Sequence, residues 1–232
     1  MRGGAPGGAS APERRIVLIN PNTSAATTQA MVGIAREVQA GEGSFELVGL
    51  TAPSGPPIIS TPAELAAAGD VVAGLVAELE GNCAGAIVSA FGDPGLQRLR
   101  ERLSVPVVGI AEAGMRAAAA GGRRFAIVTT TPDLVAPITA RAQAYGVGRQ
   151  LCGTFLTEGS LAEVMAAPER LREALAKTIR RALGATDAGA IVIGGGPLAR
   201  AARELGSTCT VPLIEPVPEA CRALLRQIMP LR

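Results

Sequence analysis

The chain has no histidine and no tryptophan, and its only aromatic residues are four phenylalanines and one tyrosine. The lack of histidine excludes Ser-His-Asp and Cys-His catalysis, and it also excludes histidine-ligated metal sites. Nucleic-acid binding by base stacking needs exposed aromatic rings, which are almost absent here. The net charge is +2 and no run of like charge occurs. We therefore expect no nucleic-acid partner.

Membrane and metal signals are also missing. No apolar run reaches the ~20 residues needed to span a bilayer. Residues 1–14 are rich in Gly, Ala and Pro but lack the apolar core of a signal peptide, so they are predicted to be a disordered tail. The four cysteines show no Cys-x-x-Cys or other metal spacing; they are Cys83, Cys152, Cys209 and Cys221. We expect free thiols in a cytoplasmic protein, no metal and no membrane association.

Aliphatic residues supply the core. Hydrophobic residues make up 48% of the chain and aromatic residues only 2%, so Ala, Val, Ile and Leu must fill the interior. This composition suits helices packed on parallel β-strands.

An internal repeat organises the chain. Residues 85–96 (GAIVSAFGDPGL) and residues 189–198 (GAIVIGGGPL) lie about 104 residues apart, and each has a buried strand pattern followed by a Gly/Pro loop. The VPVV at residues 105–108 is echoed by VPLI at 211–214. The repeat predicts two pseudo-symmetric α/β domains with mainly parallel sheets of about four strands and an active-site cleft between them. The predicted bounds are 15–118 plus 217–232 for the first domain and 119–216 for the second.

Four loops follow predicted strands, where open α/β sheets bind their ligands. They lie at residues 20–24, 90–92, 129–131 and 194–196, and their hydroxyls and amides suit a carboxylate or enolate oxygen. The first and third loops serve equally well as helix caps, and that alternative stays open. The predicted binding residues are Asn20, Asn22, Thr23, Ser24, Phe91, Gly92, Thr129, Thr130, Thr131, Gly194 and Gly196.

Helical patterns connect the strands. One helix is predicted over residues 62–79, two helices over 161–183 with a break near Pro168, and a last helix over 218–228 that packs back onto the first domain. Glu112 follows a strand at 105–110 and is best interpreted as a first-turn carboxylate favoured by the helix dipole.

Two motifs, INPNTS at residues 19–24 and FGDPGL at residues 91–96, resemble those of hydantoin racemases, a branch of the aspartate/glutamate racemase superfamily. The segments VPVVGIAEA (105–113) and RFAIVTT (124–130) agree, and the resemblance runs from about Arg15 to the C-terminus. It implies two pseudo-symmetric α/β domains and catalysis without cofactor or metal. In that mechanism one cysteine thiolate removes a proton beside a carbonyl, a second thiol reprotonates the opposite face, and amides bind the enolate-like oxyanion.

The chain departs from this family pattern at both thiols. The first family cysteine directly precedes FGDPGL, where this chain has Ala90, and the second corresponds to Gly195. We take these two positions as the catalytic centre, with Asp93 and Glu112 as nearby ionisable candidates. Small residues at 90, 194 and 195 predict more space than the family usually has.

Three hypotheses follow. We favour a thiol-independent enzyme acting on a small carboxylate or cyclic amide, by decarboxylation or other lyase chemistry, ring opening or cyclisation. Arylmalonate decarboxylases, relatives with one cysteine and a glycine at the position of Ala90, already do such chemistry. The second hypothesis is a racemase with a non-cysteine base, and the third is an inactive binding protein. The candidate bases are Asp93, Glu112, Glu158, Glu215 and Tyr145. We expect a homo-oligomer in each case.

Overall fold

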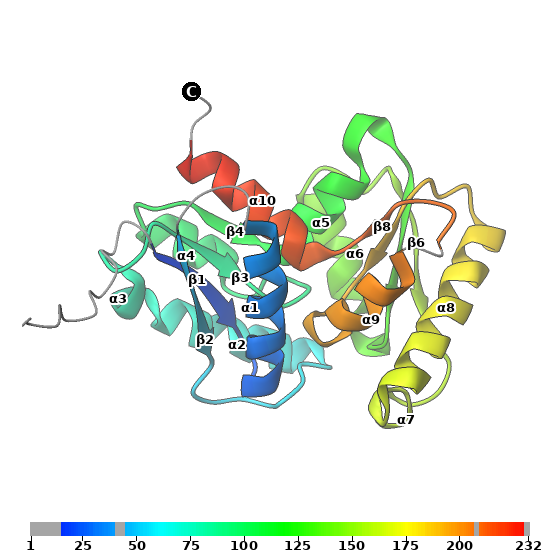
Figure 1. The fold of residues 1–232 in the computed structure, drawn as a ribbon, viewed down its shortest axis with the longest axis horizontal. Helices are drawn as coiled ribbons and strands as arrows, with labels where there is room; N and C mark the ends of the chain where they lie inside the picture. Colours follow the sequence, from blue (N-terminus) through cyan, green and yellow to red (C-terminus); the bar gives the residue numbers. More distant parts are fainter. Residues whose placement is uncertain (1–14, 40–44, 207–208, 230–232) are drawn as a thin grey trace, which may run out of the picture.

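The protein folds around two separate four-stranded parallel sheets (Figure 1). The computed structural model describes residues 15–39, 45–206 and 209–229, so the tail predicted over 1–14 lies outside the described residues. The first sheet has the order β2-β1-β3-β4, with β1 (Arg15–Asn20), β2 (Glu46–Thr51), β3 (Gly85–Val88) and β4 (Val107–Gly109). The second has the order β6-β5-β7-β8, with β5 (Phe125–Thr129), β6 (Leu151–Leu156), β7 (Ile191–Ile193) and β8 (Leu213–Ile214).

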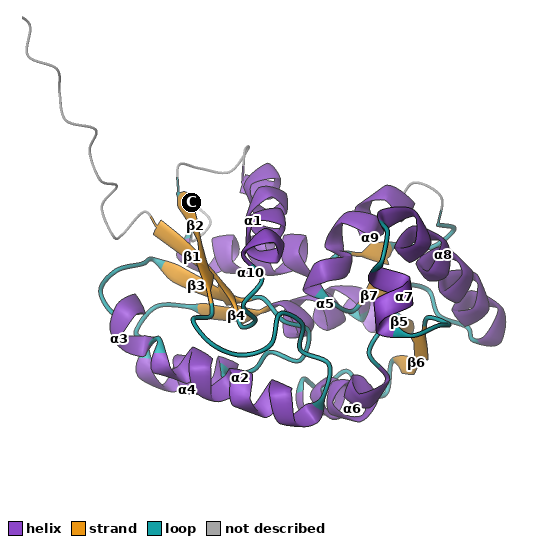
Figure 2. Ribbon diagram, turned by 90° about the horizontal axis from the view of Figure 1, so that it is seen from below, coloured by secondary structure: helices purple, strands orange, loops and turns teal. Residues whose placement is uncertain are grey.

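Helices cover both sheets (Figure 2). The α-helices are α1 (Ala25–Gln39), α2 (Pro62–Gly74), α3 (Val76–Leu79), α4 (Leu96–Arg102), α5 (Ile110–Ala118), α6 (Val135–Ala144), α7 (Leu161–Met165), α8 (Pro168–Ala185), α9 (Ala199–Leu205) and α10 (Pro216–Ile228). Short 3₁₀ turns precede α6, at Pro132–Leu134, and α9, at Gly196–Leu198.

The predicted fold class is confirmed. The two Gly-Ala-Ile-Val strands lie in different sheets, and β3 and β7 are both interior strands. Their aliphatic side chains are fully buried because helices pack on both faces of each sheet. The domain bounds proposed from the repeat stay a prediction.

Two expectations about helices are confirmed and one is wrong. The break near Pro168 is present between α7 and α8, and α10 packs on α1, β3 and β4 of the first sheet. The single helix predicted over 62–79 is interrupted at Leu75, directly after Gly74, because glycine favours a helix end over a helix interior.

One hydrophobic cluster belongs to both halves of the molecule. It joins Phe91 and Met115 of the first half to Ile127, Ile138 and Val192 of the second. Helix α5 contacts α10 on one side and α6 and β7 on the other, so it lies between the sheets. The two halves therefore share buried apolar surface as well as a backbone connection.

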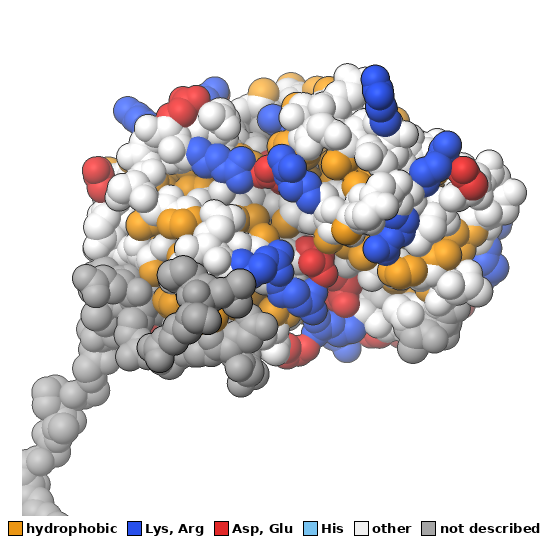
Figure 3. Space-filling view, turned by 90° about the horizontal axis from the view of Figure 1, so that it is seen from above, with side chains coloured by type: hydrophobic (Ala, Val, Ile, Leu, Met, Phe, Trp, Pro, Cys, Tyr) orange, Lys and Arg blue, Asp and Glu red, His pale blue; other side chains and the backbone are white. Residues whose placement is uncertain are grey.

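Side chains of opposite charge lie together at several places on the surface. On the face shown in Figure 3, Lys and Arg side chains lie beside Asp and Glu side chains. Arg203 of α9 pairs with Glu37 of α1 and, at 3.2 Å, with Glu215 before α10, which links the two halves. In the part of the chain that the structure describes, no helix is long and apolar enough to cross a membrane.

Candidate functional site

A cavity lies at the carboxyl ends of the strands, between the two halves of the molecule. About 50 Å³ of it can be occupied by the centre of a water-sized molecule, and the space not filled by atoms is about 610 Å³ when the open solvent at its mouth is included. All four predicted loops contribute to it, through Asn22, Ala90, Phe91, Thr129, Thr130, Thr131, Gly194, Gly195 and Gly196. Ser89, which sequence reasoning passed over, also lines the cavity. The only sequence signal for it was its place between the Gly-Ala-Ile-Val strand and Ala90.

Hydroxyl and amide groups line one part of the cavity. Thr129 donates its hydroxyl to the carbonyl of Gly194 at 2.8 Å, which ties the loop after β5 to the loop after β7. The backbone N–H groups of Ala90, Phe91, Gly195 and Gly196 have no hydrogen-bond acceptor among the described residues. Unpaired amides beside a cavity are suited to a ligand oxygen that carries negative charge.

Aliphatic side chains line the rest of the cavity, and sequence reasoning did not identify them. They come from the proline-rich loop after β2, from α2, from the segment leading into α6 and from α7, and comprise Ile58, Ile59, Leu65, Leu134, Ile138, Leu161 and Met165. The proline content of the loop at residues 52–61 was the available signal, because such a loop is ordered or functional. An aliphatic wall of this kind suits an apolar substituent of a ligand.

Ionisable side chains are absent from the cavity lining within the described part of the chain. None of the four cysteines lines it: Cys83 and Cys221 are buried in the first half, and Cys152 and Cys209 are partly exposed in the second. No group of three or more His, Cys, Asp or Glu side chains in the described segments is arranged to hold a metal ion.

The glycine loop after β7 has a backbone that disfavours side chains. Gly195 has a φ of +155°, and a Cβ built there would lie 3.1 Å from Cγ of Leu198. A Cβ on Gly194 would lie 2.9 Å from the Phe91 ring. The Phe91 ring from the opposite loop thus fills the space beside Gly194, and the expectation of more space than the family usually has stays a prediction.

Several predicted binding residues shape the loop after β1 without lining the cavity. Asn20 is buried and donates through Nδ2 to Oδ1 of Asn22 at 2.9 Å and to Oγ1 of Thr28 at 3.0 Å. Ser24 accepts the N–H of Thr27 at 3.2 Å and so caps α1. Among these residues only Asn22 reaches the cavity lining.

Two further predicted residues lie against neighbouring loops. Thr23 donates its hydroxyl to the carbonyl of Gly55 at 3.4 Å. Gly92 packs against Leu65, since a Cβ there would lie 3.1 Å from the leucine methyl groups. Both residues position the proline-rich loop and α2 beside the cavity.

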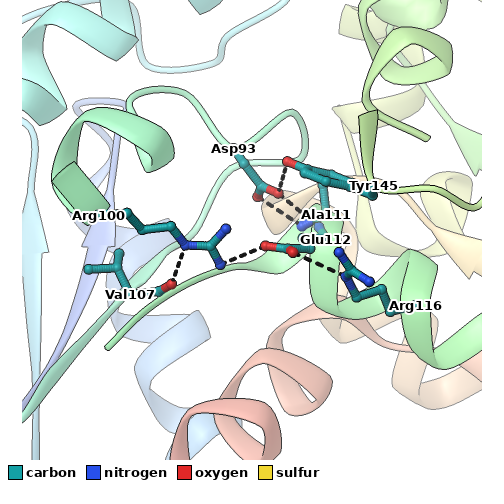
Figure 4. A network of polar contacts seen from close by, with 7 residues as sticks. All are labelled: Asp93, Arg100, Val107, Ala111, Glu112, Arg116 and Tyr145. Atoms are coloured by element: carbon teal, nitrogen blue, oxygen red, sulfur yellow. Dashed lines mark hydrogen bonds and ion pairs between the residues drawn. The ribbon is translucent and has the colours of Figure 1, made fainter. Parts of the chain in front are cut away.

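The two ionisable candidates, Asp93 and Glu112, also lie outside the cavity lining. Figure 4 shows the polar contacts that they make instead. Asp93 is 1% exposed, and its carboxylate accepts the N–H groups of Ala111 at 2.9 Å and Glu112 at 2.8 Å at the start of α5. The Tyr145 hydroxyl donates to the same carboxylate at 2.7 Å. Burial raises the pKa of Asp93 to about 6, although these three hydrogen bonds act in the opposite direction.

Glu112 forms ion pairs with Arg100 at 2.7 Å and Arg116 at 3.1 Å, as Figure 4 shows. It lies in the first turn of α5, as its sequence position predicts. Burial raises the pKa of the Tyr145 phenol, and the Asp93 carboxylate beside it has the same effect. Asp93, Glu112 and Tyr145 thus form one network that joins the loop after β3 to α5 and to the end of α6.

The two remaining candidate bases are paired elsewhere. Glu158 pairs with Lys177 at 2.6 Å on an exposed surface, and Glu215 pairs with Arg203. Neither lines the cavity. The geometry thus brings together the loop residues predicted to bind a ligand and leaves the candidate bases apart from them.

Known proteins resemble the whole described fold. A family model for Asp/Glu/hydantoin racemases matches residues 16–224. The hydantoin racemase of Paenarthrobacter aurescens is 29% identical over 211 residues, which cover 90% of this chain and 88% of that protein. The solved allantoin racemase from Klebsiella pneumoniae is 32% identical with a TM-score of 0.83, covering 90% of this chain and 85% of that one. Arylmalonate decarboxylase, at 16% identity and a TM-score of 0.59 over 94% of this chain and 94% of that one, shares the fold.

Proposed function

Because the chain belongs to the Asp/Glu/hydantoin racemase family, we propose that it is an enzyme acting on a small carboxylate or cyclic amide through an enolate-like oxyanion, without a thiol and without a cofactor. The observation that carries the proposal is the composition of the cavity. Unpaired amides and hydroxyls line one part, aliphatic side chains line the rest, and no ionisable side chain of the described residues is present.

Racemisation needs a base on one face of the carbon and an acid on the other. At Ala90 and Gly195, where the family resemblance implies thiols, the side chains carry no proton donor or acceptor. A non-cysteine base would have to come from Asp93, Glu112, Glu158, Glu215 or Tyr145. All five lie outside the cavity lining, which favours a reaction that needs no side-chain base.

Breaking a carbon–carboxylate bond is such a reaction. The bond's electron pair passes into the neighbouring carbonyl, and the resulting oxyanion accepts hydrogen bonds from the amides of residues 90, 91, 195 and 196. The apolar side chains of Ile58 and Ile59 shield the reacting groups from water, which strengthens these hydrogen bonds. The carbanionic carbon then takes a proton from a water molecule that enters the cavity as CO₂ leaves. Loss of CO₂ balances the step without an oxidant or reductant.

A binding protein is the second candidate. The same absence of ionisable groups from the cavity favours it, because a ligand held by amides and hydroxyls needs no reaction partner. Cyclic amides are the first ligands to test, because the similar proteins include the allantoin racemase from Klebsiella pneumoniae and the hydantoin racemase from Paenarthrobacter aurescens.

The test is a product analysis with an enantiopure 5-substituted hydantoin, enantiopure allantoin and phenylmalonate in deuterated buffer, by mass spectrometry and chiral chromatography. We expect a product of changed composition. Inversion of a stereocentre with deuterium uptake and unchanged composition would contradict the proposal and support a racemase. Binding without turnover would support the second candidate.

A pair of variants localises the activity. Ala90→Leu fills the cavity and should abolish turnover. Ala185→Leu makes the same change at an exposed site at the end of α8 and should leave turnover intact. Equal rates in both variants would show that the reaction takes place elsewhere.

A further inference from the structure

Ser89 is a buried polar residue whose side chain has no partner. It is 2% exposed, directly follows β3, and lines the cavity. Its Oγ belongs to the few buried side-chain oxygens among the described residues that make no hydrogen bond. A buried hydroxyl without a hydrogen-bond partner destabilises the ligand-free protein. Its presence at this position therefore needs a functional explanation.

The backbone at Ser89 is firmly held. Its N–H donates to the carbonyl of Ile19 at 2.8 Å, which continues the ladder between β3 and β1. Its carbonyl oxygen faces the opposite half of the molecule, 3.5 Å from the position that a Cβ of Gly196 would take. Ser89 therefore lies on a rigid strand end between the two glycine-containing loops, which suits a preorganised binding group.

Two other hydroxyls of the cavity lining and one side-chain amide oxygen are already engaged. Thr129 donates to Gly194, its hydroxyl lies 3.3 Å from that of Thr131, and Oδ1 of Asn22 accepts from Asn20 and from the N–H of Ser24. Ser89 differs because its hydroxyl is buried and unpaired. A donor kept free in this way is available to an acceptor that arrives with the ligand.

We infer that the Ser89 hydroxyl binds the ligand directly, by donating a hydrogen bond to a carbonyl or carboxylate oxygen that lies next to Ala90. The inference rests on the proposed function, because it takes the same cavity as the substrate site. It adds a specificity-determining side chain that acts together with the amides of the loops. Ligands that present an acceptor oxygen at this point bind, and analogues lacking that oxygen leave the hydroxyl unpaired and bind more weakly.

A matched pair of variants separates this role from a structural one. Ser89→Ala removes the hydroxyl in the cavity. Thr154→Val removes another buried, unpartnered hydroxyl, on β6, which does not line the cavity. Because neither hydroxyl makes a hydrogen bond in the described fold, both variants should melt at or above the temperature of the unmodified protein.

The measurement is titration calorimetry with hydantoin, allantoin and phenylmalonate, together with thermal melting of each variant. For the probe that binds best, Ser89→Ala should weaken binding by about tenfold or more, and Thr154→Val should leave it unchanged. Unchanged affinity in Ser89→Ala would overturn this inference and leave the proposed function standing. A lower melting temperature in Ser89→Ala than in Thr154→Val would also overturn it, because the hydroxyl would then have a partner within the fold. Failure of the unmodified protein to bind any probe would overturn the proposed function and this inference with it.

Discussion

Asp93 shows how a residue with the chemistry of a catalyst can serve the fold. Its φ of +49° is uncommon outside glycine, and three hydrogen bonds hold the side chain in place. The carboxylate fits only because residue 109 is glycine, where a Cβ would lie 2.3–2.5 Å from the carboxyl atoms. Asp93 therefore links the loop after β3 to α5 and, through Tyr145, to the second half.

The burial of Asp93 predicts a pH dependence of stability. Its pKa is raised from 3.8 to about 6 in the folded state. Between these values the folded protein binds more protons at this group than the unfolded chain does. Its contribution to the free energy of unfolding therefore falls as pH rises through this window, by at most about 1.4 kcal/mol per pH unit.

Asp93→Asn removes this titration and supplies the control. Urea unfolding from pH 4 to pH 8 should show the unmodified protein losing stability relative to Asp93→Asn as pH rises through about 6, with a difference that becomes constant above about pH 7. A difference that stays constant across the whole range, or changes in the opposite direction, would show that Asp93 does not titrate as a buried carboxyl.

Gly195 gives the second prediction at this scale. Because its φ of +155° disfavours a side chain, Gly195→Ala should destabilise the protein by about 1–3 kcal/mol in urea unfolding. Gly184→Ala, at an exposed helical position with open space around it, is the control and should stabilise the protein slightly. A Gly195→Ala variant as stable as the control would mean that the loop accepts a side chain without strain.

At the scale of elements, α7 matters because two of its five residues, Leu161 and Met165, line the cavity. So short a helix depends on its cap. The Ser160 hydroxyl accepts the N–H of Glu163 at 3.3 Å, and the Glu163 carboxylate accepts the N–H of Ser160 at 2.8 Å. The cap thus places part of the aliphatic wall.

Ser160→Ala should cost α7 about 1 kcal/mol of local stability. For any substrate found by product analysis, we expect KM to rise several-fold and kcat to change little, because the wall binds substrate and transition state alike. Steady-state kinetics checks this prediction. A several-fold fall in kcat with unchanged KM would show instead that α7 contributes to the chemical step.

The two sheets and the position of the cavity could be predicted from the sequence. The repeated Gly-Ala-Ile-Val strands predicted two sheets, and the loops after them predicted where the cavity lies, because both depend on local pattern and on the geometry of parallel sheets. The aliphatic wall could not be predicted, because Ile59 and Met165 come to line the same cavity only through tertiary packing. The engagement of Asp93 with α5 and Tyr145 likewise depends on residues far apart in sequence.

At the scale of the whole molecule, the shared hydrophobic cluster and the Asp93–Tyr145 hydrogen bond predict that both halves unfold together. Tyr145 is the only tyrosine and the chain has no tryptophan, so its fluorescence reports on the contact between the halves. In urea, tyrosine fluorescence and far-UV circular dichroism should give coincident transitions. Two separate steps in the dichroism would show that each sheet and its helices unfold independently.

The central claim is that the reaction uses no thiol, and alkylation under native conditions tests it most directly. A cysteine that acts on substrate must be reachable from the cavity, and Cys83, Cys152, Cys209 and Cys221 do not line it. Intact mass would count the thiols modified by iodoacetamide while turnover of the identified substrate is followed. The account predicts an unchanged rate as the partly exposed cysteines react. A rate that falls in proportion to the alkylation of one cysteine, with the melting temperature unchanged, would contradict it.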